Sequence, residues 1–232
     1  MQKTLTDENK RLCWDAIDTV LLDMDGTLLD LSFDNQFWNQ TVPQHFAKLN
    51  QLKPADAEAH LAPIFAAEVG KLNWYCIDFW SDVLGFKVAE LKEAHADKVR
   101  WRPHAESFLR RLTDSQREVL LITNAHPETL RIKQSRVNLA PWFKHMLTSH
   151  ELGSAKESQA FWDALNSAHP FDPERTLFVD DSEHVLDAAN AYGIQFLLTL
   201  QQPDSTRPIR EQTRYPSVLH FNEIFEGLPG VD

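Results

Sequence analysis

The sequence has few cysteines, no long apolar run and fewer basic than acidic residues, and each shortage narrows the class of protein. Cys13 and Cys76 are the only cysteines among 232 residues, and their spacing is not that of a metal-binding motif. They indicate reduced thiols in a cytosol. No apolar run approaches the roughly 20 residues that cross a bilayer. The composition is that of an ordinary globular protein without repeats or low-complexity segments.

Basic residues are outnumbered by acidic ones. The chain has 23 lysines and arginines against 34 aspartates and glutamates, which gives a formal charge of -11 and a pI near 5.3. We therefore expect no nucleic acid and no membrane surface as a partner, and an anionic substrate must be met by local positive groups. The first residues, MQKTLTDENKRL, are polar and lack a secretory apolar segment. We expect a soluble, cytoplasmic protein.

Short apolar runs alternate with helical patterns over most of the chain. The predicted strands end at Asp23, at Thr123, near Ser149, at Asp180 and near Leu200. The predicted helices between the later strands span 105–113, 127–137, 157–168 and 183–192. Near-continuous apolar strands alternating with helices indicate an α/β fold, with a parallel sheet that is covered on both faces.

Residues 32–100 interrupt this alternation. They contain no convincing strand, and their helix-like segments are interrupted at Pro43, Pro54 and Pro63. Because some 70 residues are too many for a structureless loop, we predict an inserted helical cap over 32–100 and a core domain formed by 1–31 and 101–232. The C-terminal stretch RYPSVLHFNEIFEGL is predicted to add a final packing helix.

Polar side chains follow three of the predicted strands, at the point where each strand ends. They are Asp23 and Asp25, Thr123 and Asn124, and Asp180 and Asp181. Ligands of open α/β sheets bind outside the carboxyl ends of the strands, so we expect these side chains to share one pocket. Lys156 lies where a helix is predicted to begin, a position at which the helix dipole disfavours a cation. Its place there favours a bound anion.

Four carboxylates in one pocket repel one another. At 4 Å and an effective dielectric constant near 20, each like-charged pair costs about 4 kcal/mol. Either some of them are protonated or a cation lies among them. No cysteine or histidine cluster accompanies them in the sequence, so an all-oxygen site for Mg²⁺ fits better than a zinc site.

The spacing of DMDGT gives its two aspartates different roles. Asp23 is the first residue beyond its strand and can direct an oxygen at phosphorus, forming an aspartyl-phosphate that divides hydrolysis into two easier steps. Asp25 follows along a turn that Gly26 permits, and it can protonate the leaving oxygen and then deprotonate a water. His126 is another candidate acid or base, but we interpret it as a helix-start residue.

The other polar residues of the expected pocket have binding roles. Thr123 offers a hydroxyl group to phosphate oxygens, and Lys156 neutralises charge on the phosphoryl group and on the attacking carboxylate. Asn124 is either a further phosphate contact or a turn residue. Of Asp180 and Asp181, one is a metal ligand and the other is a second ligand or the N-cap of the next helix.

Four motifs in a fixed order resemble those of the haloacid dehalogenase (HAD) superfamily of phosphohydrolases. They are DMDGT, the strand end at Thr123, Lys156 and VDDSEHVLDAA. The resemblance implies a Rossmannoid parallel sheet with a C1-type helical cap between the first two motifs, where this chain carries its insert. It also implies Mg²⁺ as cofactor, with these contacts: the Asp23 carboxylate, the Asp25 main-chain carbonyl and Asp181, with Asp180 bonded through water.

A narrower resemblance covers nearly the whole chain. LNWYCIDFW, ITNAHPETL and ERTLFVDDSE are similar to segments of bacterial HAD purine 5'-nucleotidases that act on GMP and IMP. This implies a small-molecule phosphomonoester as substrate. Other possibilities remain: a sugar-phosphate phosphatase, a phosphomutase, or, from another class, a receiver-like or non-catalytic phosphate-binding protein. Four aromatic residues of the insert, Trp74, Tyr75, Phe79 and Trp80, either stack on a purine or pack in the core.

Overall fold

Six parallel strands form the central sheet of this computed structural model, which describes residues 12–230; residues 1–11, with most of the polar N-terminal stretch, and residues 231–232 lie outside it. The strands are β1 (Thr19–Leu22), β2 (Glu118–Thr123), β3 (His145–Thr148), β4 (Thr176–Val179), β5 (Phe196–Leu200) and β6 (Ser217–Val218). Their order is β3-β2-β1-β4-β5-β6, and every pair is parallel. The predicted α/β fold is confirmed, and β1 lies inside the sheet.

Both faces of the sheet are buried, because successive side chains of a strand enter different cores. Val20 and Leu22 of β1 pack in one apolar cluster, whereas Leu21 between them packs in another. The helices of the core domain are α7 (Ala105–Asp114), α8 (Pro127–Gln134), α9 (Ser149–Leu152), α10 (Gln159–Ala168) and α11 (Glu183–Tyr192). The first cluster takes the apolar face of α7, and the second takes those of α10 and α11. The strands are continuous apolar runs in the sequence because both faces of the sheet are covered.

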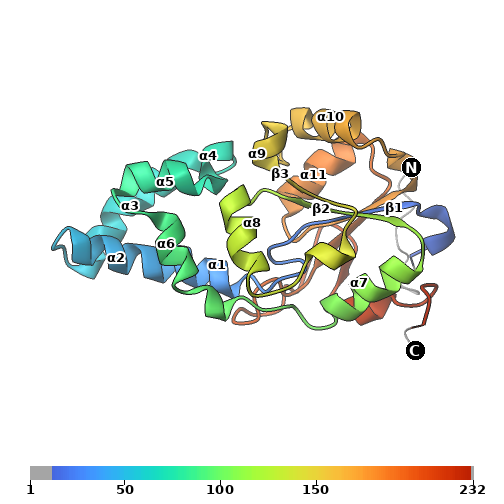
Figure 1. Ribbon diagram of the computed structural model, residues 1–232, viewed down its shortest axis with the longest axis horizontal. Helices are drawn as coiled ribbons and strands as arrows, with labels where there is room; N and C mark the ends of the chain where they lie inside the picture. The colour runs from blue at the N-terminus through green and yellow to red at the C-terminus, as the bar shows by residue number, and fades with distance from the viewer. Residues whose placement is uncertain (1–11, 231–232) are drawn as a thin grey trace.

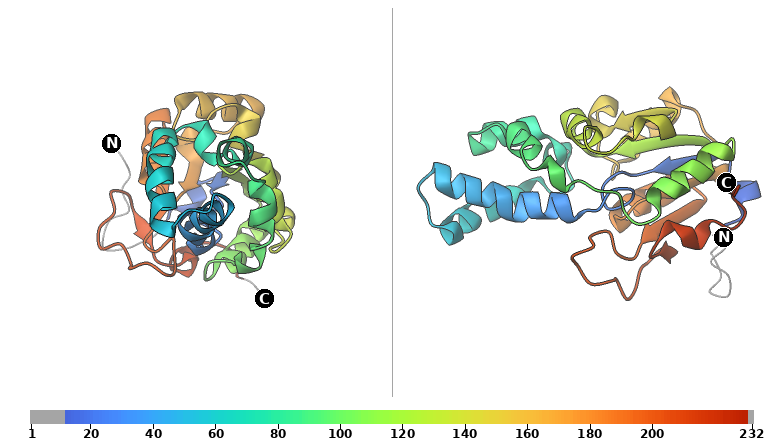
Figure 2. Two further views of the ribbon diagram at one scale, coloured as in Figure 1. Left: turned by 90° about the vertical axis from the view of Figure 1, so that its left-hand side faces the viewer. Right: turned by 60° about the horizontal axis from the view of Figure 1, so that its bottom comes forward.

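Between β1 and residue 100, all the regular elements are helices or helical turns. It contains α1 (Ser32–Gln36), the π-helical turn η2 (Phe37–Thr41), α2 (Val42–Leu49), α3 (Pro54–Glu68), α4 (Leu72–Tyr75), α5 (Ile77–Leu84), α6 (Val88–Glu93) and the 3-10 turn η3 (Ala96–Lys98). These helices have an apolar core of their own, which includes Phe37, Val42 and Trp80. They lie together beyond the carboxyl edge of the sheet (Figure 2). This arrangement supports the proposed division into a cap, 32–100, and a core domain.

Two of the three expected proline breaks are wrong. Pro54 does begin α3, but Pro43 lies in the first turn of α2 and Pro63 lies inside α3. The π-helical turn η2 continues directly into α2, with Thr41 in helical conformation, so Pro43 lies close to the junction of these two helical segments. Pro63 and Ala59 are both exposed, so the carbonyl group that loses its partner can be solvated.

The expected C-terminal helix is also wrong. Residues 217–218 instead form β6, because Thr199 N donates to Pro216 O and Gln201 N donates to Val218 O. Up to residue 230, the one element that follows is the 3-10 turn η6 (Phe221–Ile224), which packs on the α7 side of the sheet. The other 3-10 turns are η1 (Trp14–Ala16), η4 (Ala140–Trp142) and η5 (Pro173–Arg175). Within residues 12–230, no helix is both long and apolar enough to cross a membrane.

Candidate active site

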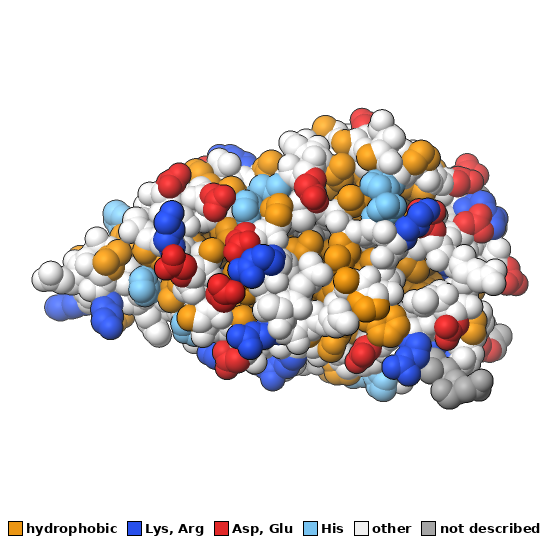
Figure 3. Space-filling view, in the orientation of Figure 1, with side chains coloured by type: hydrophobic (Ala, Val, Ile, Leu, Met, Phe, Trp, Pro, Cys, Tyr) orange, Lys and Arg blue, Asp and Glu red, His pale blue; other side chains and the backbone are white. Residues whose placement is uncertain are grey.

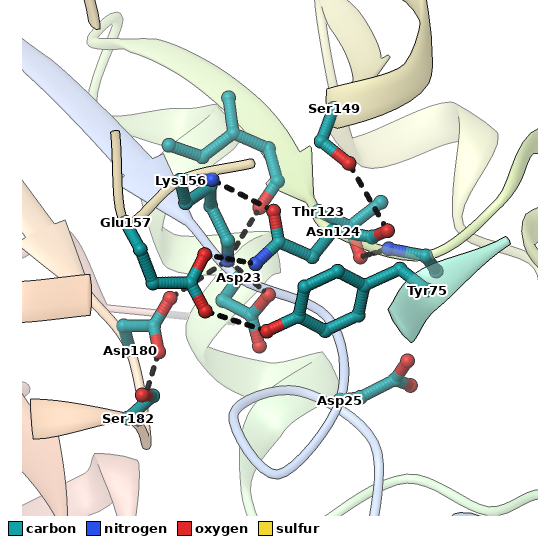
Figure 4. A network of polar contacts seen from close by, with 12 residues as sticks. Asp23, Asp25, Tyr75, Thr123, Asn124, Ser149, Lys156, Glu157, Asp180 and Ser182 are labelled. Carbon is teal, nitrogen blue, oxygen red and sulfur yellow. Dashed lines mark hydrogen bonds and ion pairs between the residues drawn. The ribbon is translucent and has the colours of Figure 1, made fainter. Parts of the chain in front are cut away.

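The polar strand ends meet at the carboxyl edge of the sheet, in a cavity of about 280 Å³ beneath the cap. Asp23 follows β1, Thr123 ends β2 and Asp180 follows β4 (Figure 4). The core side of the cavity includes Asp23, Asp25, Thr123, Asn124, Lys156, Asp180, Asp181 and Ser182. The cap side includes Asp34, Asn35, Trp38, Phe65, Trp74, Tyr75, Ile77, Trp80 and Lys92. All seven residues expected at the site therefore line one pocket.

Lys156 is a buried cation on the core side of this pocket. Its Nζ lies 2.5 Å from Asp23 Oδ1 and 2.7 Å from Asp180 Oδ2, and it also donates to Ile122 O. Burial by itself lowers the pKa of Lys156, but the two carboxylates outweigh it and raise that pKa. The ammonium group therefore keeps its charge beside Asp23. Lys156 lies in the turn before α10, with Ser158 as the N-cap, so the helix begins later than predicted.

Three carboxylates lie close enough to hold one cation. Oxygens of Asp23, Asp180 and Asp181 are all within 4.8 Å of one another. Both oxygens of Asp180 are engaged, one by Lys156 and the other by Ser182 N at 2.8 Å. The Asp181 carboxylate forms a long ion pair with Arg210, at 3.9 Å. Asp181 is thus the member of the cluster with oxygens to spare.

The electrostatics of the cluster favour a hard divalent cation. Burial, followed by the charges of Asp180 and Asp23, raises the pKa of Asp181 well above its usual value. Burial also raises the pKa of Asp23 to about 6, against the attraction of Lys156. A bound Mg²⁺ would offset these costs, because it favours the ionised form of every oxygen ligand. The donor set, oxygen only, fits that ion.

Gly26 leaves space for the Asp181 carboxylate. Its φ of +80° lies in the left-handed region, and a Cβ atom there would come within 2.6 Å of Asp181 Cγ. The turn that carries the chain from Asp23 past Asp25 therefore requires glycine both for its backbone and for the carboxylate that lies against it.

Asp25 lies away from the other carboxylates and is held by a lysine that the sequence did not suggest. Its Oδ1 is 2.5 Å from Lys133 Nζ, and the same ammonium group lies 2.5 Å from Asp34 of the cap. In Figure 4 the Asp25 carboxylate points away from the bonded group around Lys156. Burial raises the pKa of Asp25 to about 6, although Lys133 opposes the change. Lys133 belongs to the buried side of α8 together with Thr129, a spacing of one helical turn that could have signalled its position.

A second hydrogen-bonded group joins the cap to the core at the pocket. Tyr75 of α4 donates to Glu157 Oε1 at 2.6 Å, and Asn124 Nδ2 donates to Glu157 Oε2 at 3.0 Å. Asn124 Oδ1 in turn accepts from Lys156 N at 2.9 Å (Figure 4). The side chain of Asn124 therefore fixes the Lys156 turn. The Thr123 hydroxyl accepts from Ala125 N and so supports the loop after β2.

The structure bears out the interpretation of His126. It is the N-cap of α8, and its Nδ1 accepts from Glu128 N. The four cap aromatics differ in whether they line the cavity. Trp74, Tyr75 and Trp80 reach the cavity, whereas Phe79 is not among the residues that line it. Trp80 also has an exposed fraction of only 1% and lies in the cap core.

The fold and the acidic strand ends define a hydrolase of the α/β class with a helical cap, and comparison with known proteins agrees. The model of one family, haloacid dehalogenase-like hydrolase, matches residues 17–193. The chain therefore belongs to the haloacid dehalogenase-like hydrolases, and it is an enzyme of the phosphatase kind.

Two relatives narrow the class of hydrolase that the chain resembles. The chain is 37% identical over 217 residues to the GMP/IMP nucleotidase YrfG of Escherichia coli K12, an alignment that covers 94% of this chain and 98% of the relative. The protein of the same name from Shigella flexneri matches equally well. The resemblance to purine nucleotidases expected from the cap sequence is thus confirmed.

Solved structures share the fold at low identity. A HAD phosphatase from Thermococcus onnurineus superposes with a TM-score of 0.73 and 18% identity, over 89% of this chain and 95% of that one. The L-2-haloacid dehalogenase from Xanthobacter autotrophicus superposes with a TM-score of 0.58 and 16% identity, over 88% and 95%. These similarities concern the fold alone.

Proposed function

We propose that this protein is a Mg²⁺-dependent phosphomonoester hydrolase that acts through an aspartyl-phosphate, with the purine nucleotides GMP and IMP as its substrates. The observation that carries the proposal is the placement of Asp23 beside Lys156 and two further carboxylates, at the base of a pocket with an aromatic cap wall. The similarity to a relative named GMP/IMP nucleotidase supports the choice of substrate. A cytoplasmic location is part of the proposal, consistent with the two free thiols.

The first chemical step forms a bond between Asp23 and phosphorus. A carboxylate oxygen of Asp23 attacks the phosphorus atom, and the bond from phosphorus to the nucleoside 5' oxygen breaks. Asp25 turns from Lys133 towards the pocket that it lines and gives its proton to the departing oxygen. Lys156 keeps its charge and stabilises the negative charge that gathers on the phosphoryl oxygens.

The second step releases phosphate. Asp25, now ionised, takes a proton from a water molecule whose oxygen attacks phosphorus, and the bond from phosphorus to Asp23 breaks. A pKa raised to about 6 by burial suits a group that gives and then takes a proton near neutral pH. The step restores the Asp23 carboxylate and leaves inorganic phosphate in the pocket.

Mg²⁺ would be held by the Asp23 and Asp181 carboxylates and by the main-chain carbonyl of Asp25, with Asp180 bonded through water. The free oxygens of Asp181 and the engaged oxygens of Asp180 support this assignment over the reverse one. When bound, the ion supplies charge neutralisation for the carboxylates and the phosphoryl group.

The cap gives the pocket a wall suited to a planar base. Trp38, Phe65, Trp74 and Ile77 line the cavity opposite the carboxylates, and Asn35 and Asn39 lie there as hydrogen-bonding groups. Aromatic faces stack on bases, and amide groups can pair with the edge of a purine. A sugar phosphate would leave this apolar surface without a partner.

The test is phosphate release by the purified protein from nucleoside monophosphates and sugar phosphates, with Mg²⁺ and with a chelator. We expect metal-dependent hydrolysis that favours GMP and IMP over CMP, UMP and glucose phosphates. Activity on sugar phosphates alone would reject the nucleotide assignment, and phosphate transfer to a sugar would indicate a phosphomutase. A long-lived phosphoprotein without turnover would favour a receiver-like protein.

A further inference from the structure

A second group of metal-ligating side chains lies where the cap meets the core, outside the carboxylate cluster. It comprises Cys76, at the break between α4 and α5, His126 at the start of α8 and His150 in α9. One ligand atom of each lies within 4.8 Å of the other two. Figure 3 shows histidine side chains at the surface where the helices of the cap adjoin those of the core.

Each histidine of this group has one ring nitrogen, Nε2, for which the described residues provide no hydrogen-bond partner. His126 uses Nδ1 to accept from Glu128 N, which leaves Nε2 free, 3.6 Å from the exposed Asp78 carboxylate. Within residues 12–230, His150 Nε2 is buried and has no hydrogen-bond partner. The rings of His126 and His150 lie edge to face with centroids 4.8 Å apart. A buried, unpartnered ring nitrogen beside a second imidazole and a thiol is unfavourable unless another atom binds there.

We propose that Cys76, His126 and His150 form a site for a borderline-soft divalent metal, Zn²⁺ in the first place, that joins the cap to the core. One thiolate and two imidazoles are the donors that zinc prefers, whereas Mg²⁺ avoids them. Zinc bonds of about 2.0–2.3 Å place tetrahedral ligand atoms about 3.3–3.7 Å apart, so a movement of about 1 Å completes the site. Asp78 or water supplies the fourth ligand.

The bound metal would hold the cap against the core, a role that we call a latch. Tyr75, the residue before Cys76, already bonds to Glu157 at the pocket, so a metal on Cys76 would fix the α4–α5 junction to α8 and α9. A cap that is fixed to the core in this way would open less readily for substrate entry and product release. Zinc is therefore expected to slow turnover, a consequence that rests on the proposed phosphatase function, whereas metal binding itself does not.

The binding test uses Co²⁺ as a spectroscopic probe on the full-length, reduced protein, with Mg²⁺ in excess to occupy the carboxylate site. A thiolate ligand gives cobalt a charge-transfer absorption in the near ultraviolet that oxygen ligands do not give. We expect this absorption in the wild type and in Cys13→Ser, and its loss in Cys76→Ser. Its absence from the wild type, or its persistence in Cys76→Ser, overturns the proposal.

Histidine variants test the other two ligands. His126→Asn retains a good helix N-cap. We expect it to weaken cobalt binding at least about tenfold, because the loss of a residue that only hydrogen-bonds to a metal ligand already has an effect of that size. His150→Ala should do the same, and circular dichroism verifies its fold. His184, 87% exposed on α11, gives the matched control His184→Ala, which should bind cobalt normally. Equal binding by all three variants contradicts the site.

The turnover test separates the latch from the chemistry. Zinc should inhibit phosphate release by the wild type reversibly, and Cys76→Ser should need at least about tenfold more zinc for half inhibition. Equal inhibition of both proteins rejects the latch and assigns the effect to the carboxylate site. If neither protein releases phosphate, the proposed function fails, while the cobalt spectrum still decides whether the site exists.

Discussion

At the scale of single residues, two buried lysines each bridge a pair of carboxylates at the pocket. Lys156 pairs with Asp23 and Asp180, and Lys133 pairs with Asp25 and Asp34. Lys156 lines the pocket, whereas Lys133 lies behind Asp25, so the proposed nucleophile and the proposed acid belong to separate ion-pair groups. The two carboxylates still interact, because the charge of Asp23 helps to raise the pKa of Asp25.

Asp23→Asn should abolish activity and spare the fold. The amide keeps the shape of the carboxylate but is not a nucleophile, so we expect the rate of phosphate release to fall at least about a thousandfold. The control is Asp187→Asn on α11, which loses contacts with Arg214 and Tyr215 outside the pocket and should stay active. Substantial activity in Asp23→Asn would remove it from the role of nucleophile.

Lys133→Met should destabilise the protein by about 3 kcal/mol, because it leaves buried carboxylates without their shared cation. Burial raises the pKa of Asp34, yet Lys133 and Lys92 outweigh it and lower that pKa to about 2. Stability from Asp34 is thus complete above the unfolded pKa of about 4 and is lost as the pH falls towards 2. Urea denaturation at pH 7 and at pH 3 measures the cost, which should shrink at pH 3, where part of the stability from Asp34 is already lost.

The matched control for Lys133 is Lys144, which pairs with Glu118 at the surface. Lys144→Met should change the free energy of unfolding by less than about 1 kcal/mol. Similar losses in the two variants would show that Lys133 contributes through its aliphatic packing or not at all, and that its ion pairs carry no stability.

At the scale of elements, the loops after the strands carry the site, and the turn at Gly26 is the most constrained of them. Gly26→Ala should raise the Mg²⁺ concentration for half-maximal activity by roughly 10–100-fold, because its Cβ would displace the Asp181 carboxylate. Gly85 at the end of α5 also has a positive φ, but a Cβ there meets open space. Gly85→Ala should therefore lose stability and keep its metal requirement.

The elements also show what a sequence can disclose. Five strands, and the polar residues after three of them, were predictable, because apolar runs that are buried on both faces end abruptly. β6 was not, since Ser217 and Val218 form too short a run and their strand depends on hydrogen bonds to β5. The partners of Lys133 lie 108 and 99 residues away, and no local pattern gives such contacts.

The cysteine–histidine group escaped prediction for the same reason. Cys76 lies in the cap, and His126 and His150 precede or begin different helices of the core domain, so their spacing along the chain resembles no metal motif. Only the contact of cap with core brings the three side chains together. The residues of the strand-end site could therefore be predicted from local sequence, whereas the cysteine–histidine group is visible only in the tertiary structure.

At the scale of the whole molecule, Mg²⁺ should stabilise the fold, because the proposed site for it consists of carboxylates that are gathered only in the folded state. At a hundredfold excess over its dissociation constant, a ligand adds about 2.7 kcal/mol, which raises the melting temperature by about 5–10 °C for a chain of this size. Thermal unfolding with and without Mg²⁺ measures the shift. Asp181→Ala should abolish most of it, and an undiminished shift would place the ion elsewhere.

The position of β1 inside the sheet has a consequence for hydrogen exchange. Asp23 N donates to Val179 O of β4, and β1 is bonded to β2 on its other side, so this amide is expected to exchange with solvent only when the whole core domain unfolds. The cap has a core of its own and is expected to open and exchange sooner. The proposed nucleophile, Asp23, is thus expected to be held by the slowest-opening part of the molecule, while the cap above it opens sooner.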